Sequence, residues 1–155
     1  SLYILGAVCV QARLLCNLLD GMIAIEGGKK SKTGEIWNDF PDRIADSLFL
    51  IGAGYSISHG TLGMTLGWSA ALLAMFTAYT RVLGASAGTQ MFFSGPMAKP
   101  HRMALLTAAC LYACLELSMQ WNPVGMTVAL SVIIAGSALT VARRILSICK
   151  ELDPK

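Results

Sequence analysis

Five long apolar stretches, separated by short segments rich in glycine, proline or charge, run along the 155-residue chain. Each stretch is close to the roughly 20 residues that a helix needs to cross a bilayer. The pattern predicts helices at about residues 2–25, 35–57, 62–83, 103–120 and 124–145. We therefore expect an all-α, polytopic membrane helix bundle with five transmembrane helices, forming a single domain over residues 1–155.

Polar side chains recur at spacings of three and four in the first two helices, which places them on one face of each helix. They are Arg13, Asn17 and Asp20 in the first helix, and Asn38, Asp42 and Asp46 in the second. Polar and ionisable side chains within membrane helices normally face the bundle interior or a watery cavity. The spacing therefore predicts one buried polar site between the two helices.

Composition supports a lipid environment and narrows the classes of partner. Hydrophobic residues make up 55% of the chain and charged residues 14%, and the mean hydropathy is +0.60. Soluble domains usually carry about 25% charged residues. The net charge of +3 comes without a dense basic stripe or interleaved aromatic residues, so we expect no nucleic acid partner. The five cysteines form no CxxC pair and are expected to be free.

Basic residues occur in every second segment that connects or follows the predicted helices. The segments that contain them hold Lys29, Lys30 and Lys32; Arg81, Lys99 and Arg102; and Arg143, Arg144, Lys150 and Lys155. The two intervening turns have no Lys or Arg, and this distribution places the basic segments in the cytoplasm. We therefore expect an integral membrane protein whose polar site faces the cytoplasm. Glu116, near the other end of its helix, is expected to reach the opposite interface.

Carboxylates are concentrated near this site, since six of the nine acidic residues lie between Asp20 and Asp46. Oxygen ligands without nearby histidine or cysteine suit Mg²⁺ or Mn²⁺ rather than zinc. Two such ions would relieve the repulsion between the acids and could clamp a diphosphate. The alternative is that these acids are solvated or paired with Arg13 and Arg43.

The same residues resemble the signature of the CDP-alcohol phosphotransferase family, Asp-x2-Asp-Gly-x2-Ala-Arg followed by Gly-x3-Asp-x3-Asp. Asp20, Gly21 and Ala24 match its central part, whereas Asn17 stands at the first Asp and Ile25 at the Arg. A divergent bacterial subgroup of the family carries Asn-x2-Asp-Gly and Asn-x3-Asp-x3-Asp, so the resemblance implies a protein of a bacterial inner membrane. The resemblance covers about the first third of the chain.

The second half of the signature aligns in two registers. Keeping the distance from Asp20 makes Gly34 the family's glycine and places Asn38 and Asp42 at the last two acids. Matching the local sequence from Asp42 to Asp46 to the end of the signature instead makes these two residues the last two acids of the family. We favour the second register because it keeps two carboxylates on the second helix, and Asp42 belongs to the site in both.

The resemblance implies a membrane transferase with a six-helix core, whose first helix would precede Ser1. Family members transfer a phosphatidyl or similar group from a CDP-linked donor, such as CDP-diacylglycerol, to an acceptor alcohol and release CMP, in phospholipid biosynthesis. They often form homodimers.

The resemblance also implies roles for particular residues. Two Mg²⁺ or Mn²⁺ ions would be held by Asn17, Asp20, Asp42 and Asp46. Asp46, with Asp42, would act in catalysis, and Asp46 would accept the proton of the acceptor hydroxyl. The donor nucleotide would contact Gly21, Ala24, Gly34 and Asn38, and a phosphate on the acceptor would contact Arg81, Lys99 or Arg102.

Two other functions are compatible with the pattern. Acids within membrane helices also mark the pathways of ion- or proton-coupled transport proteins. Here, however, they cluster at one end of the span, and only Glu116 could extend such a pathway. A family member that has lost catalysis is the other alternative, and Asn17, Asn38 and Ile25 are the departures that favour it.

Overall fold

A computed structural model of the chain contains five α-helices and describes residues 2–26, 32–57, 60–92 and 95–153. The helices are α1 (Leu2–Glu26), α2 (Lys32–Tyr55), α3 (Thr61–Ser86), α4 (Lys99–Ser118) and α5 (Gly125–Leu152). The described ranges contain no strand, which confirms the all-α class. The five cysteines are free, as expected.

Several helix ends differ from the predicted ones. Helix α2 begins at Lys32, so Gly34 lies in its first turn rather than in a loop. Helix α4 begins at Lys99 because Pro100 occupies its first turn, where the missing N–H would have no helical partner. Helix α5 continues to Leu152 because no glycine or proline follows Arg144 until the helix ends.

Among the described residues, three helical segments are long and apolar enough to cross a membrane: Leu2–Leu19, Thr61–Ser86 and Gly125–Leu152. These three segments support the prediction of a membrane protein. Five membrane-spanning helices were predicted, and by length and composition three of the five helices qualify. Helix α2 falls outside this set because Asp39, Asp42, Arg43 and Asp46 interrupt its apolar sequence. The residues that create the polar site are therefore the ones that lower the hydropathy of α2.

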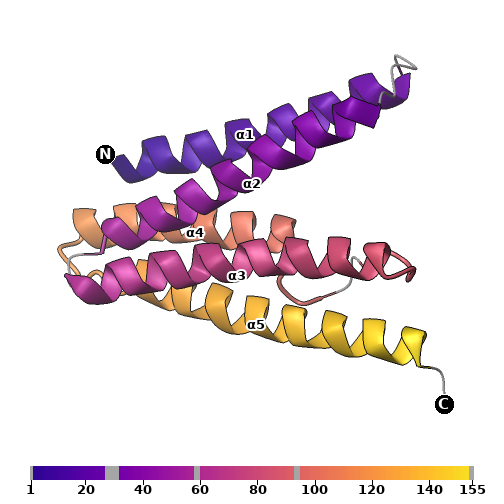
Figure 1. The fold of residues 1–155 in the computed structure, drawn as a ribbon. Coiled ribbons are helices and arrows are strands. Elements are labelled where there is room, and N and C mark those ends of the chain that lie inside the picture. Colours follow the sequence, from indigo (N-terminus) through magenta and orange to yellow (C-terminus); the bar gives the residue numbers. More distant parts are fainter. Residues whose placement is uncertain (1, 27–31, 58–59, 93–94, 154–155) are drawn as a thin grey trace.

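The helices form a bundle in which α3 packs between α2 and α5, while α1 packs mainly against α4. Figure 1 shows that the end of α1 lies beside the start of α2 and that the two helices diverge toward the N-terminus. The ends of α1, α3 and α5 and the start of α2 lie toward one end of the bundle. The end of α2, the start of α3 and the α4–α5 turn lie toward the other end (Figure 1).

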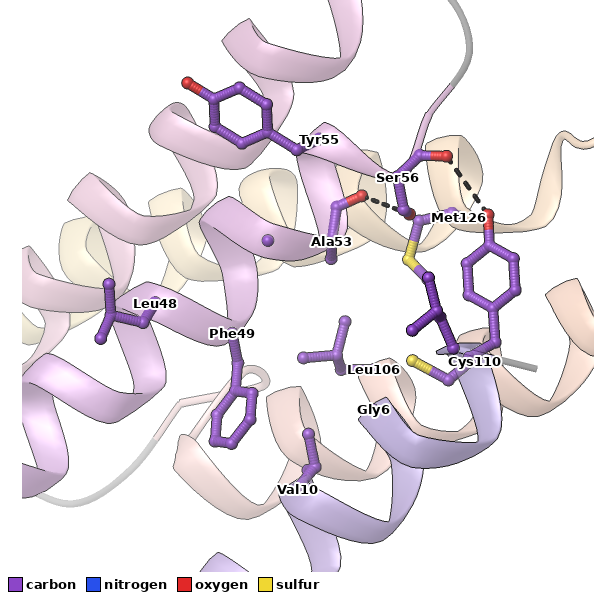
Figure 2. A pocket seen from close by; sticks show the side chains of 13 residues that line it. Gly6, Val10, Leu48, Phe49, Ala53, Tyr55, Ser56, Leu106, Cys110 and Met126 are labelled. Atoms are coloured by element: carbon purple, nitrogen blue, oxygen red, sulfur yellow. Dashed lines mark hydrogen bonds between the residues drawn. The ribbon is translucent and has the colours of Figure 1, made fainter.

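An apolar cavity of about 560 Å³ opens where α1 and α2 diverge. Figure 2 shows Val10, Phe49 and Leu106 lining it from three different helices. The Tyr3 hydroxyl donates to the Ser56 carbonyl at 3.2 Å, and the Ser56 hydroxyl donates to the Ala53 carbonyl at 2.7 Å. Both hydroxyls thus have partners, and most of the other lining residues of the cavity are apolar.

Candidate functional site

One face of α2 carries four charged side chains near the middle of the helix, namely Asp39, Asp42, Arg43 and Asp46. The three acids are spaced by three and four residues, and Arg43 lies four residues after Asp39 and three before Asp46, which brings the side chains to one side of the helix. Asp46 is buried, Asp42 and Arg43 are partly buried, and Asp39 is about half exposed. The depth of burial increases along the helix, so the innermost carboxylate depends most on its protein neighbours.

Arg13 of α1 pairs with both inner carboxylates. Its Nη2 lies 2.6 Å from Asp42 Oδ1 and 2.9 Å from Asp46 Oδ1. The same nitrogen donates a hydrogen bond of 3.1 Å to the Asp42 carbonyl. The distance to Asp46 makes an ion pair without the direction of a hydrogen bond, and neither Asp46 oxygen has a hydrogen-bond partner among the described residues. Asp46 is 3% exposed, so its charge depends strongly on this pairing.

The outer carboxylates have their own cationic partners. Lys99 Nζ, at the start of α4, pairs with Asp42 Oδ2. Arg43 Nε donates to Asp39 Oδ2 at 3.2 Å, and Arg81 Nη2 of α3 lies 3.5 Å from Asp39 Oδ1. Burial raises the pKa of Asp39, but the hydrogen bond and charge of Arg43, with the charges of Arg81 and Lys99, outweigh burial and lower it. Four helices thus contribute to one charged cluster.

A cationic pocket adjoins the carboxylates. It encloses about 120 Å³, and its charged lining residues are Arg43, Arg81, Lys99, Arg102 and Arg144. We use the term cationic pocket for this space and these five side chains.

Thr77 of α3 organises the inner wall of the cationic pocket. Arg102 Nη1 donates to the Thr77 hydroxyl at 3.1 Å and to the Met97 carbonyl at 3.0 Å, while Arg144 donates to the Thr77 carbonyl. Burial lowers the pKa of Arg102 to about 10, which still leaves it protonated at neutral pH. The two guanidinium groups are therefore held as fixed positive charges at one wall of the pocket.

The described charges of the cluster do not balance. Its cations are Arg13, Arg43, Arg81, Lys99, Arg102 and Arg144, and its acids are Asp39, Asp42 and Asp46. Six positive charges thus face three negative ones in a partly buried space. Guanidinium groups and ammonium groups gathered around such a pocket are suited to bind phosphate oxygens.

Asp42 and Asp46 have the donor chemistry for a hard divalent ion. Their oxygens suit Mg²⁺ or Mn²⁺, and the buried Asp46 Oδ2 has no hydrogen-bond partner among the described residues. Within the described part of the chain, no three His, Cys, Asp or Glu residues group as a metal site. A complete site would need further ligands, and the side chain of Asp20, expected to supply one, lies outside the described part.

The structure brings together five of the predicted site residues, which are Asp42, Asp46, Arg81, Lys99 and Arg102. Asn17 is partly buried on α1, and Gly34 is exposed in the first turn of α2. The side chains of Asp20 and Asn38, and the surroundings of Gly21 and Ala24, lie outside the described residues, so their predicted roles stay predictions.

Sequence reasoning missed Thr77 and Arg144 as members of the cluster, and it considered Arg43 only as a partner for the acids. The spacing of four between Thr77 and Arg81 was a local signal that both face the same side of α3. Arg144 gave no such signal, because its partner is on another helix. No protein-family model, curated protein or solved structure matches the chain.

Proposed function

We propose that this chain is a membrane transferase of the CDP-alcohol phosphotransferase type. It would move a phosphatidyl or other phospho-alcohol group from a CDP-linked donor, such as CDP-diacylglycerol, to an acceptor alcohol and release CMP. The observation that carries the proposal is the contact between a carboxylate pair, the partly buried Asp42 and the buried Asp46, and a pocket with excess positive charge. This chemistry needs carboxylates that bind metal ions and cationic side chains that bind phosphate groups.

Each part of the cluster has a distinct role in the proposed reaction. Asp42 and Asp46, with Asn17 and Asp20 of α1, would hold Mg²⁺ or Mn²⁺, which would neutralise charge on the diphosphate when bound. Asp46 would accept the proton of the acceptor hydroxyl. Lys99, Arg81 and Arg102 would hold the phosphate of an acceptor that carries one. Helices α1 and α2 would supply the first set of groups, and α3 and α4 the second.

The apolar surroundings suit a lipid donor. The cavity of about 560 Å³ between α1 and α2 has an apolar lining, and exposed side chains such as Leu48 and Tyr55 stand at its edge. The acyl chains of a lipid donor could remain among such side chains while its head group reaches the charged cluster. This arrangement gives a reason for a transferase site to be built into a helical bundle with membrane-spanning segments.

A direct test measures CMP release by the purified chain with CDP-diacylglycerol, Mn²⁺ and a panel of acceptors. Candidate acceptors include glycerol phosphate, inositol phosphate and serine. We expect Asp46→Asn to lower the rate by about 10²- to 10⁴-fold, the usual contribution of a general base. Asp42→Asn should lower both the rate and the affinity for Mn²⁺. Asp153→Asn, at an exposed acid after α5, is the matched control and should leave the rate unchanged.

One observation favours a family member without catalysis. Arg13 and Lys99 already neutralise Asp42 and Asp46, as a purely structural ion network would. That alternative predicts no CMP release with any acceptor and unchanged Mn²⁺ affinity in Asp42→Asn. The transferase proposal would be abandoned on that result.

A further inference from the structure

Lys99 lies between the carboxylates of the charged cluster and the cationic pocket. Its ammonium group pairs with Asp42, and its side chain also lines the cationic pocket beside Arg43, Arg81 and Arg102. It is the first residue of α4, and its side chain is 23% exposed, against 12% for Arg13. A lysine has a flexible four-carbon stem and three donors that are free to rotate, so it can change partner without a movement of the helix.

The local charge around the inner carboxylates is already balanced. Asp42 and Asp46 carry two negative charges, and Arg13 and Lys99 carry two positive ones. A divalent cation that binds Asp42 would therefore stand beside an ammonium group that holds the same carboxylate. The metal ion and the ammonium group would both carry positive charge and would repel each other. This repulsion is strong where water is partly excluded. One of the two side chains has to leave for the ion to bind well.

Arg13 is the less suitable group to leave. It contacts both carboxylates and also donates to the Asp42 carbonyl, so its departure would break three interactions at once. Lys99 has a single carboxylate partner among the described residues. The cationic pocket that it already lines gives its ammonium group a second position.

We propose that Lys99 is an exchangeable counterion, which neutralises Asp42 when no metal is bound and moves into the cationic pocket when a divalent cation takes its place. In the pocket, the ammonium group would join four guanidinium groups, which is unfavourable unless an anion is present. Lys99 therefore couples metal binding at Asp42 to anion binding in the cationic pocket. When the metal binds, the Lys99 ammonium group is free to bind the anion, and when the anion binds, it attracts Lys99 away from Asp42. This positioning role rests on the metal site of the proposed function.

The coupling is reciprocal, because each ligand must change the affinity of the other by the same factor. The test uses the full chain in detergent, Mn²⁺ as the metal and sulfate as the anion, with free Mn²⁺ followed by electron paramagnetic resonance. Sulfate should tighten Mn²⁺ binding to the unmodified chain about fivefold, at the low end of usual coupling. In Lys99→Gln, Mn²⁺ should bind about fivefold more tightly without sulfate, and sulfate should have no further effect.

Two further variants guard against a folding defect. Lys99→Arg should hold Asp42 more firmly, through a planar group that pairs with both carboxylate oxygens, and should weaken Mn²⁺ binding. Opposite shifts from two substitutions at one position would not arise from misfolding. Lys150→Gln removes an exposed lysine in the last turn of α5 and should change neither affinity.

The outcomes separate this inference from the proposed function. If Asp42→Asn abolishes Mn²⁺ binding but Lys99→Gln leaves it unchanged or weaker, the metal site stands and the exchange is overturned. A sulfate effect that persists in Lys99→Gln also overturns the exchange, because the coupling then bypasses the lysine. Mn²⁺ binding that is unaffected by Asp42→Asn overturns both the exchange and the metal site.

Discussion

Glu116 shows how far a single side chain can depart from its expected place. The position of Glu116 near the end of α4 predicted contact with the interface, yet the side chain is 2% exposed. Its Oε1 accepts hydrogen bonds from the backbone N–H groups of Val124 at 3.0 Å and Gly125 at 2.9 Å. These donors begin α5 and would otherwise lack helical partners. The carboxylate thus caps one helix from the end of another, and the expected position was wrong.

Replacement of Glu116 should therefore weaken the α4–α5 turn. We expect Glu116→Ala to lower the free energy of unfolding by about 1–2 kcal/mol, since it removes the acceptor for both N–H groups. Glu116→Gln keeps one side-chain oxygen and should lose less than half as much. Thermal unfolding in detergent checks the order. Equal losses in the two variants would show that charge, rather than the capping hydrogen bonds, provides the stabilisation.

At the scale of elements, α2 and α3 pack with their backbones in close contact. A Cβ added at Gly54 would lie 2.5 Å from the Gly63 carbonyl oxygen and 2.7 Å from Gly67 Cα. Both neighbours are backbone atoms, so they cannot turn aside as a flexible side chain would. The glycines at these positions allow the two helices to approach closely, and van der Waals contact between their backbones joins them.

Alanine at Gly54 should force α2 and α3 apart. We expect Gly54→Ala to lower the free energy of unfolding by about 1–3 kcal/mol, the usual cost of overpacking. Gly52→Ala is the matched control, because it adds the same methyl group to the same helix with no atom within 4 Å. It should be neutral or stabilising, since alanine favours helices over glycine. If both variants unfold alike, the close approach of the helices contributes nothing to stability.

On the scale of the whole molecule, the arrangement of the helix ends agrees with the alternating basic segments. The end of α3 and the C-terminus lie toward one end of the bundle, and the α4–α5 turn lies toward the other (Figure 1). Arg81 and Arg144, at the cationic pocket, also lie in the later parts of α3 and α5. The orientation predicted from the basic residues would place the charged cluster on the cytoplasmic side, and this orientation stays a prediction.

Labelling from each side of the membrane tests this orientation. Cys149 is exposed near the end of α5 and should react with an impermeant maleimide only in inverted vesicles, after the other cysteines are replaced by serine. Asn122→Cys, in a chain that also lacks Cys149, should react only in intact cells, because Asn122 is exposed in the α4–α5 turn. Labelling of both positions from the same side would contradict the predicted orientation of the bundle.

The sequence by itself determined the helices and the local faces they carry. Five apolar stretches predicted all five helices, and the spacing of Asp42 and Asp46 put both carboxylates on one side of α2, because helical geometry depends only on neighbours along the chain. Helix ends were less certain, since Gly34 and Lys99 were predicted outside helices that in fact include them.

Only the tertiary structure decided which charges meet. Arg13 and Asp46 are far apart in the chain, as are Arg144 and Thr77, and their pairing depends on how whole helices pack. Likewise, the spacing of residues around Lys99 did not predict whether this side chain binds a phosphate ligand or pairs with a carboxylate of the protein. The acidic segment predicted a cluster of carboxylates and left open whether metal ions, water or the side chains of Arg13 and Arg43 stabilise it. In the folded chain, Arg13 and Lys99 neutralise two of them, because packing of α1 and α4 brings cations to α2.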